Sequence, residues 1–131
     1  MRKLTPIITV ETIEPCLAFW TETLGFDVPV TVPHEDAIGF AILQKDGAEL
    51  MYQTRASIDA DLGESGTPTG LGTELAGGRS LLFVEVDAID PLLPKLEDIE
   101  VVVPRRKTFY GMDEVFVRAP CGTVVGFAAK V

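Results

Sequence analysis

Carboxylate, thioether and amide side chains alternate along one apolar stretch of the sequence, at Glu49, Met51 and Gln53. Residues two apart in a strand point to the same face of a sheet, so we expect these three side chains to lie together. A second apolar stretch ends in Glu85. A carboxylate in an apolar site can have a raised pKa and act as a general base. Glu49 and Glu85 are therefore the candidates for catalysis without a metal.

Two further rows of residues have the same alternating pattern, and each would present one face of a strand. They are Thr5, Ile7 and Thr9 in the first half of the chain and Leu81, Phe83 and Glu85 in the second. An aromatic pair, Phe109 and Tyr110, precedes Gly111 at the end of a later strand. These sets are mainly apolar with a few polar groups, which is typical of small-molecule sites.

Motifs for nucleophilic catalysis and nucleotide binding are missing from the sequence, which has no GxSxG, P-loop or dinucleotide fingerprint. Cys16 falls near the expected start of a helix, where the helix dipole can lower a thiol pKa, but no histidine is placed to act as its base. The only histidine of the sequence, His34, is expected in a solvated loop. Cys16 and Cys121 have no metal-ligand spacing, and we expect reduced, partly buried thiols.

The elements that must position these residues occur twice. The chain reads VETIEP at residues 10–15 and VDAIDP at residues 86–91, each time between an apolar, β-branched run and an expected helix. Val10 then corresponds to Val86 and Gly47 to Gly122, with one residue fewer in the second helix. The sequence therefore predicts an α+β fold built from two βαβββ modules.

The two expected helices differ. The first follows a strand over residues 4–10, with Thr12 as N-cap, Pro15 in the first turn and Gly25 in the left-handed position at its end. Four residues at helical spacing would form its buried stripe: Ile13, Leu17, Trp20 and Leu24. The second helix is expected to be short or distorted, because Pro94 removes a backbone donor.

The predicted organisation is one structural domain of two modules, residues 1–54 and 79–131, joined by a connector over residues 55–78. Glycine, serine, threonine and proline are interleaved in the connector, so we expect it to bury little apolar surface and to act as a mobile connector or lid. A module of this size does not comfortably sustain its own core, which is a reason for the two to pack together.

Composition and charge restrict the class of protein. Of 131 residues, 47% are hydrophobic and no biased tract occurs, which indicates a packed globular protein. The sequence has no signal peptide and no run of the roughly 18 apolar residues that span a bilayer, so a cytoplasmic location is expected. The net charge of −9 would repel nucleic acid and anionic membranes and favour a cationic ligand.

Three segments make the sequence resemble the vicinal oxygen chelate superfamily, which holds glyoxalase I, extradiol dioxygenases and bleomycin-resistance proteins. They are VETIEPCLAFWTETLGF, VEVDAID and the closing FYGMDEVFVRAPCGTVVGF, in which Ala119-Pro120-Cys121-Gly122 stands where Asp-Pro-Asp-Gly is usual. The likeness covers nearly the whole chain. It implies paired modules whose curved mixed sheets enclose a cleft, often in a homodimer.

Metal-dependent members of that superfamily hold a divalent cation with four side chains, one on each of four strands, drawn from His, Glu and sometimes Gln. The resemblance assigns these positions to Thr5, Met51 (or Glu49, if the register slips by two), Leu81 (with Ser80 beside it) and Gly126. Imidazoles and carboxylates are the ligands that hold a Lewis-acidic metal, and one carboxylate alone does not suffice. The expectation is a protein without a metal, a cofactor or a catalytic residue of the usual kind.

If the family register holds, the three strand rows, the aromatic pair and Gly126 line the cleft. Acidic residues of the connector would stand at its mouth: Asp59, Asp61, Glu64 and Glu74. The alternative is that the rows face a dimer partner or fill a closed core. The basic run over residues 105–107 would be a solvated edge that discourages strand pairing, or would meet an anionic group.

The leading hypothesis is a metal-free small-molecule-binding protein of the glyoxalase/bleomycin-resistance type, which sequesters a drug-like, cationic or aromatic ligand. One alternative is a glyoxalase-like lyase, isomerase or dioxygenase with an atypical site, and another is a non-catalytic assembly module. A homodimer is expected, and neither nucleic acid nor a membrane is an expected partner.

Overall fold

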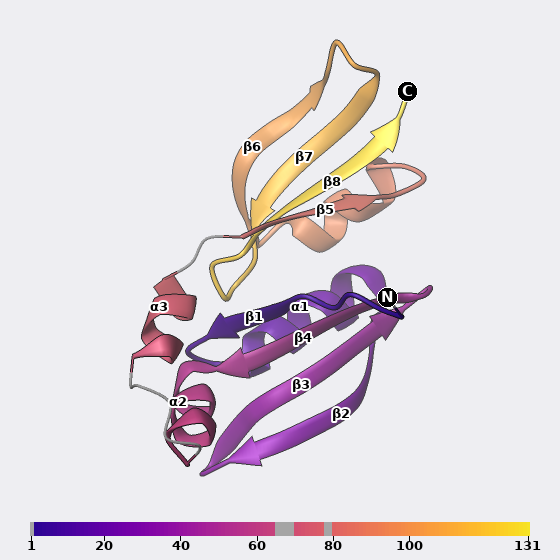
Figure 1. Ribbon diagram of the computed structural model, residues 1–131. Helices are drawn as coiled ribbons and strands as arrows, with labels where there is room; N and C mark the ends of the chain where they lie inside the picture. The colour runs from indigo at the N-terminus through magenta and orange to yellow at the C-terminus, as the bar shows by residue number, and fades with distance from the viewer. Residues whose placement is uncertain (1, 65–69, 78–79) are drawn as a thin grey trace. The chain divides into compact units, whose positions relative to one another are not determined.

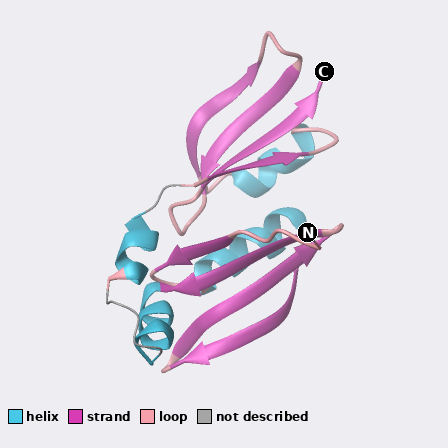
Figure 2. Cartoon of the chain, viewed as in Figure 1, coloured by secondary structure: helices cyan, strands magenta, loops and turns pink. Residues whose placement is uncertain are grey.

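A computed structural model describes residues 2–64, 70–77 and 80–131 of the chain (Figure 1). The chain divides into two compact units, residues 1–79 and residues 80–131, and each is described by itself. Each unit holds one four-stranded mixed sheet and helical segments (Figure 2). The predicted α+β class is confirmed.

Unit 1 contains the first βαβββ module. Its sheet has the strand order β1-β4-β3-β2, in which β1 runs parallel to β4 and the other neighbours are antiparallel. The elements are β1 (Ile7–Val10), α1 (Glu14–Leu24), β2 (Asp27–His34), β3 (Ala37–Lys45) and β4 (Ala48–Thr54).

Unit 2 repeats this arrangement with the strand order β5-β8-β7-β6, again with one parallel pair, β5 and β8. Its elements are β5 (Leu81–Glu85), the 3₁₀ helix η1 (Asp90–Leu96), β6 (Glu100–Lys107), β7 (Met112–Arg118) and β8 (Val124–Lys130). Ile7 pairs with Met51 in the first sheet, and Phe83 pairs with Gly126 at the corresponding place in the second. The predicted duplication is therefore confirmed at the level of strand register.

One face of the first sheet packs under α1. Leu50, Tyr52 and Thr54 alternate along β4 as buried residues. Trp20 of α1 is 2% exposed, and its Nε1–H donates to the hydroxyl of Tyr52 at 2.8 Å. This hydrogen bond joins the helix to the sheet within a core where water does not compete for it.

The ends of the helices test the predictions made from the sequence more closely. The N-cap of α1 is Ile13, without a side-chain cap, so the prediction of Thr12 is wrong. Gly25 ends α1 with φ of 71°, in the left-handed region that glycine adopts without strain, as predicted. Pro94 lies inside η1, which is a 3₁₀ helix, and the predicted distortion is confirmed.

The segment after β4 contains two helices that the sequence did not predict, α2 (Arg55–Glu64) and α3 (Leu71–Gly77). Ile58 of α2 is 5% exposed, so this segment buries some apolar surface after all. The predicted connector covered residues 55–78, of which residues 65–69 and 78 lie outside the described part of the chain.

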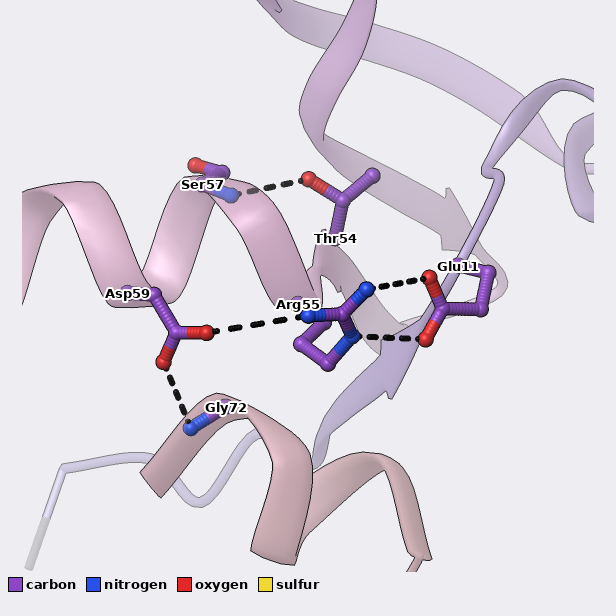
Figure 3. Close-up of polar contacts among 6 residues, drawn as sticks. All are labelled: Glu11, Thr54, Arg55, Ser57, Asp59 and Gly72. Atoms are coloured by element: carbon purple, nitrogen blue, oxygen red, sulfur yellow. Dashed lines mark hydrogen bonds and ion pairs between the residues drawn. The ribbon is translucent and has the colours of Figure 1, made fainter. Parts of the chain in front are cut away.

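Polar contacts fasten α2 and α3 to β4 and to the turn after β1 (Figure 3). Arg55 donates two hydrogen bonds to the carboxylate of Glu11, at 2.8 and 3.2 Å. Oδ2 of Asp59 lies 4.0 Å from Nη1 of Arg55, and Oδ1 of Asp59 accepts a hydrogen bond from the backbone N–H of Gly72 at 3.0 Å. The two helices are thereby linked to each other and to the first sheet.

Cys16 and Cys121 are both disulfide-bonded and neither is free, so the prediction of reduced thiols is wrong. Within the described part of the chain, no helix has the length and apolar character needed to cross a membrane.

Candidate functional site

The face of the first sheet opposite α1 carries two of the three predicted strand rows, the one with Ile7 and the one with Met51. Glu49, Met51 and Gln53 are half-buried and alternate with the buried residues of β4, so they share a face as expected. Ile7, which pairs with Met51, is 55% exposed. Thr9, the partner of Gln53, is buried. Unit 1 therefore presents a half-exposed face of apolar and polar side chains.

Thr5 is not in a strand, because β1 begins at Ile7, but its side chain does reach the predicted site. Its hydroxyl donates to Oε1 of Glu49 at 3.2 Å. Nε2 of Gln44 and Nζ of Lys3 approach Oε2 of Glu49 at 2.6 and 2.7 Å. Both carboxylate oxygens of Glu49 are thus satisfied within unit 1.

These contacts decide the chemistry of Glu49. The hydrogen bond from Lys3, then that from Gln44, holds the pKa of the Glu49 carboxyl below its ordinary value of 4.5. A general base that works near neutral pH needs the opposite shift. The expectation that Glu49 has a raised pKa is wrong, and the side chain stabilises the fold instead.

A pocket of about 380 Å³ lies beside Glu49, at the turn between β3 and β4. Its lining is polar and carries charges of both signs: Lys3, Asp27, Gln44, Lys45, Asp46, Gly47, Ala48 and Glu49. A pocket lined mainly by charged and polar residues is a poor match for an aromatic ligand, since such sites are predominantly hydrophobic.

The corresponding face of the second sheet is aromatic. Phe83 of β5 is 53% exposed, and its ring lies 6.5 Å from that of Phe116 on β7, in an edge-to-face arrangement. Gly126 pairs with both residues and lies between them in the sheet. A Cβ atom added at Gly126 would meet the ring of Phe116 at 2.8 Å, so that ring covers the glycine.

A buried carboxylate, Glu114, lies two residues before Phe116 on the same face of β7. Its side chain is 0% exposed. Nε and Nη2 of Arg106 approach its Oε1 at 2.9 and 2.7 Å, and the hydroxyl of Tyr110 donates to the same oxygen at 3.0 Å. In the described part of the chain, no donor reaches the other oxygen, Oε2, which is also buried.

The remaining predicted residues of unit 2 lie at its surface. Leu81 is 56% exposed, and Glu85 pairs with Lys130 at 3.3 Å. Phe109 is fully exposed, whereas Tyr110 is 54% exposed and joins the Glu114 cluster. Tyr110 of the predicted aromatic pair is held in this cluster by the hydrogen bond that its hydroxyl donates to Glu114; the role of both residues in ligand binding stays a prediction.

The arginines of the basic run, residues 105–107, pair with carboxylates of their own unit. This agrees with the prediction that the run meets an anionic group. Arg105 pairs with Asp113 at 2.7 Å and with Asp90 at 2.6 Å. Arg106 pairs with Glu114, and this hydrogen bond raises the pKa of the Arg106 guanidinium. The run does lie on an edge strand, β6.

The four positions that the resemblance assigns to a metal do not fit one. Thr5 and Glu49 bond to each other, Leu81 and Met51 carry no ligand of the required kind, and Gly126 lies under a phenyl ring. His34 ends β2 rather than lying in a loop. In residues 2–64, 70–77 and 80–131, no three His, Cys, Asp or Glu side chains gather as a metal site would require.

Sequence reasoning missed Lys3, Gln44 and Glu114, and it named Arg106 only as part of the basic run. The first two become neighbours of Glu49 only through the register of the sheet and the path of the N-terminal segment, which local patterns do not show. Glu114 could have been found, because the alternation in MDEVFVR places it on the same face as Phe116.

Comparisons with known proteins agree with this architecture. Three solved structures have the same fold: TioX from Micromonospora sp. ML1 (TM-score 0.71, 17% identity, 100% of both chains covered), a glyoxalase-related enzyme from Fulvimarina pelagi (0.74, 17%, 99% of this chain and 89% of that chain) and lactoylglutathione lyase from Agrobacterium tumefaciens (0.74, 14%, 97% and 92%). No curated protein is similar enough in sequence to count as a match. The family model of the Glyoxalase/Bleomycin resistance protein/Dioxygenase superfamily matches residues 4–127, so the chain belongs to that superfamily.

Proposed function

We propose that this protein binds a small molecule without a metal and sequesters it, and that the ligand is a cationic aromatic compound. The observation that carries the proposal is the set of side chains at the four metal positions of the superfamily. They offer one carboxylate, Glu49, whose oxygens are already bonded to Lys3, Thr5 and Gln44. Lewis-acid chemistry needs a cation held by several imidazoles or carboxylates.

The open faces of the two sheets support binding of an apolar ligand. Ile7 on the first sheet and Leu81 and Phe83 on the second are each more than half exposed. Apolar surface of this kind is favourable to bury, at roughly 25 cal/mol for each Å². The net charge of −9 favours the approach of a cation.

An enzyme that uses Glu49 as a base is disfavoured, since the pKa of this carboxyl is lowered. We keep the homodimer as part of the proposal, and light scattering on the purified protein tests it. A protein that stays monomeric at all concentrations would contradict that part alone.

The predicted cytoplasmic location has a direct test in the cysteines. Disulfides are rare in reducing compartments, and both cysteines here are disulfide-bonded. Because Cys16 is buried, thiols have to be alkylated while the cells are lysed under denaturing conditions, and this should label Cys16 and Cys121 if the protein is cytoplasmic and reduced. Unlabelled cysteines would place the protein in an oxidising compartment.

A thermal-shift screen tests the proposed function itself. The panel pairs cationic aromatic compounds with neutral compounds of the same shape. A ligand present at 100 times its Kd stabilises the folded state by about 2.7 kcal/mol, which raises the Tm of a chain of this length by roughly 10 °C. Cationic members should raise the Tm more than their neutral partners. A panel without any shift would contradict the proposal.

A further inference from the structure

The geometry points to Glu114 as the anchor of a bound ligand: its unpaired oxygen, Oε2, would accept a hydrogen bond from an N–H group of a cationic aromatic compound that lies against Phe83 and Phe116. This inference rests on the proposed function and specifies which residue of unit 2 recognises the ligand's charged group.

The first step of the argument is the uneven use of the two carboxylate oxygens. An arginine fork can bond both oxygens of a carboxylate at once. Here Nε and Nη2 of Arg106 both approach Oε1, and the Tyr110 hydroxyl donates to that oxygen as well. Oε2 is left buried and without a donor from the described residues. Such a group is costly to leave unsatisfied.

The second step is that the neighbouring cations of the same sheet face are already engaged. Arg118 lies further along β7, and its Nε is 2.9 Å from Oε2 of Glu100. Lys130 on β8 pairs with Glu85. Neither of these pairs includes Glu114, so neither cation supplies a donor to its Oε2.

The third step is the surface beside Glu114. The strand register places Phe83, Gly126 and Phe116 in one row, and Ala128 and Glu114 in the next. A carboxylate thus adjoins a pair of phenyl rings. A cation is attracted both to a carboxylate and to the face of an aromatic ring, and an aromatic ligand adds stacking with Phe83.

Access to the carboxylate depends on two side chains that are not packed in the core. Arg106 is 56% exposed in its side chain, and Tyr110 is 54% exposed. If Arg106 turns outward, it loses its hydrogen bond and its ion pair with Glu114. If Tyr110 turns outward, it loses its hydrogen bond to Glu114 and its ring contact with Phe109. A ligand N–H can then occupy the position next to Oε2.

Three acridines of similar size separate the contribution of the ligand's charge from that of its N–H donors. At neutral pH, 9-aminoacridine is a cation with N–H donors, 10-methylacridinium is a cation without them, and acridine itself is neutral. Fluorescence titrations of the wild-type protein should give the lowest Kd for 9-aminoacridine. The variant Glu114→Gln should weaken its binding by about 10- to 100-fold, the effect of losing a charged hydrogen bond, and should weaken 10-methylacridinium less.

The matched control is Glu97→Gln, which removes an exposed carboxylate after η1 and changes the net charge by the same amount. It should leave all three Kd values unchanged. If Glu114→Gln does not fold, the ¹³C resonance of the Glu114 carboxyl in the wild-type protein should shift when 9-aminoacridine is added and not when acridine is added.

The outcomes distinguish the inference from the proposed function. Equal binding of 9-aminoacridine by the wild type and Glu114→Gln would overturn the inference, with water as the partner of Oε2, and would leave the proposed function intact. The inference is also wrong if the Glu114 carboxyl resonance does not respond to the ligand. Failure of all three acridines to bind would contradict the proposed function and the inference together.

Discussion

The two units share one strand order but treat a carboxylate on the open face of the sheet in opposite ways. In unit 1, both oxygens of Glu49 are bonded, to Lys3, Thr5 and Gln44. In unit 2, three contacts converge on one oxygen of Glu114 and the other has none among the described residues. The two carboxylates lie on different strands of the shared order, β4 and β7, so the contrast is between two separate sites and not between two copies of one site.

The two units also differ in how the helix is attached to the sheet. In unit 1, Trp20 is hydrogen-bonded to Tyr52 and packs against Phe19 and Phe26. In unit 2, the sheet position that corresponds to Tyr52 is Phe127, which has no hydroxyl, and η1 is interrupted by Pro94. The contact between helix and sheet in unit 1 therefore includes a side-chain hydrogen bond that Phe127 cannot form in unit 2.

The largest expected effect concerns this difference. The substitution Trp20→Ala should destabilise the protein by about 3–5 kcal/mol, because it leaves a cavity under α1 and removes the hydrogen bond that the indole donates to Tyr52. Urea unfolding followed by circular dichroism measures the loss.

The control is Tyr52→Phe, which gives unit 1 the residue that unit 2 has at that place. It should cost less, about 1–2 kcal/mol, since only the hydrogen bonding of the hydroxyl is removed and the packing stays. Equal losses for the two variants would show that the hydroxyl, and not the packing of the indole, dominates this core.

A smaller effect is expected where α3 approaches α2, a contact for which unit 2 has no counterpart in its described residues. A Cβ at Gly72 would lie 2.5 Å from Oδ1 of Asp59 and 2.7 Å from the carbonyl oxygen of Arg55. Gly72→Ala should therefore destabilise the protein by about 1–3 kcal/mol and separate the helices. Hydrogen exchange of the α3 amides reports the separation.

Gly63→Ala is the matched control for this variant, because a Cβ at this α2 glycine would meet nothing within 4 Å. It should stabilise the protein by about 0.5–1 kcal/mol, the usual gain of alanine over glycine in a helix. If Gly72→Ala were equally stabilising, the close approach of the helices would be wrong.

The smallest effect concerns Glu49 and depends on pH. Its lowered pKa means that the ionised form is stabilised in the folded protein, so this contribution is present above the ordinary value of 4.5 and is lost as the pH falls through the folded pKa. The variant Glu49→Gln should be less stable than the wild type at pH 7, and the difference should shrink in acid. Urea titrations at several pH values measure it.

Glu22→Gln, at an exposed position of α1, makes the same change in charge outside the cluster. It should follow the wild type at every pH. A Glu49→Gln difference that stayed constant down to the most acidic pH would contradict the assigned role of Lys3 and Gln44.

Much of the fold could be predicted because it depends on local signals. Gly25 and Pro94 act on their own stretch of backbone, and the alternation along β4 fixes which residues share a face. The duplication could be found because the two hexapeptides fall at equivalent strand-to-helix steps, and the pairing of Phe83 with Gly126 follows from it.

The rest depends on contacts between distant residues. The helix α2 begins where Thr54 accepts a hydrogen bond from the backbone N–H of Ser57 (Figure 3). The glycines further along the predicted connector, from Gly63 on, obscure this cap in the sequence. The lowered pKa of Glu49 needs Lys3, far away in the sequence, and the Glu114 cluster needs the register of β6 against β7. Composition alone shows neither.

The central claim is that this protein binds its ligand without a metal. The most direct test is a calorimetric titration of 9-aminoacridine into protein stripped of metal by a chelator, repeated after zinc, nickel, iron or manganese is restored. We expect saturable binding with the same Kd in every case. Binding that appears only after a metal is restored, or a stoichiometric metal that resists the chelator, would contradict the account.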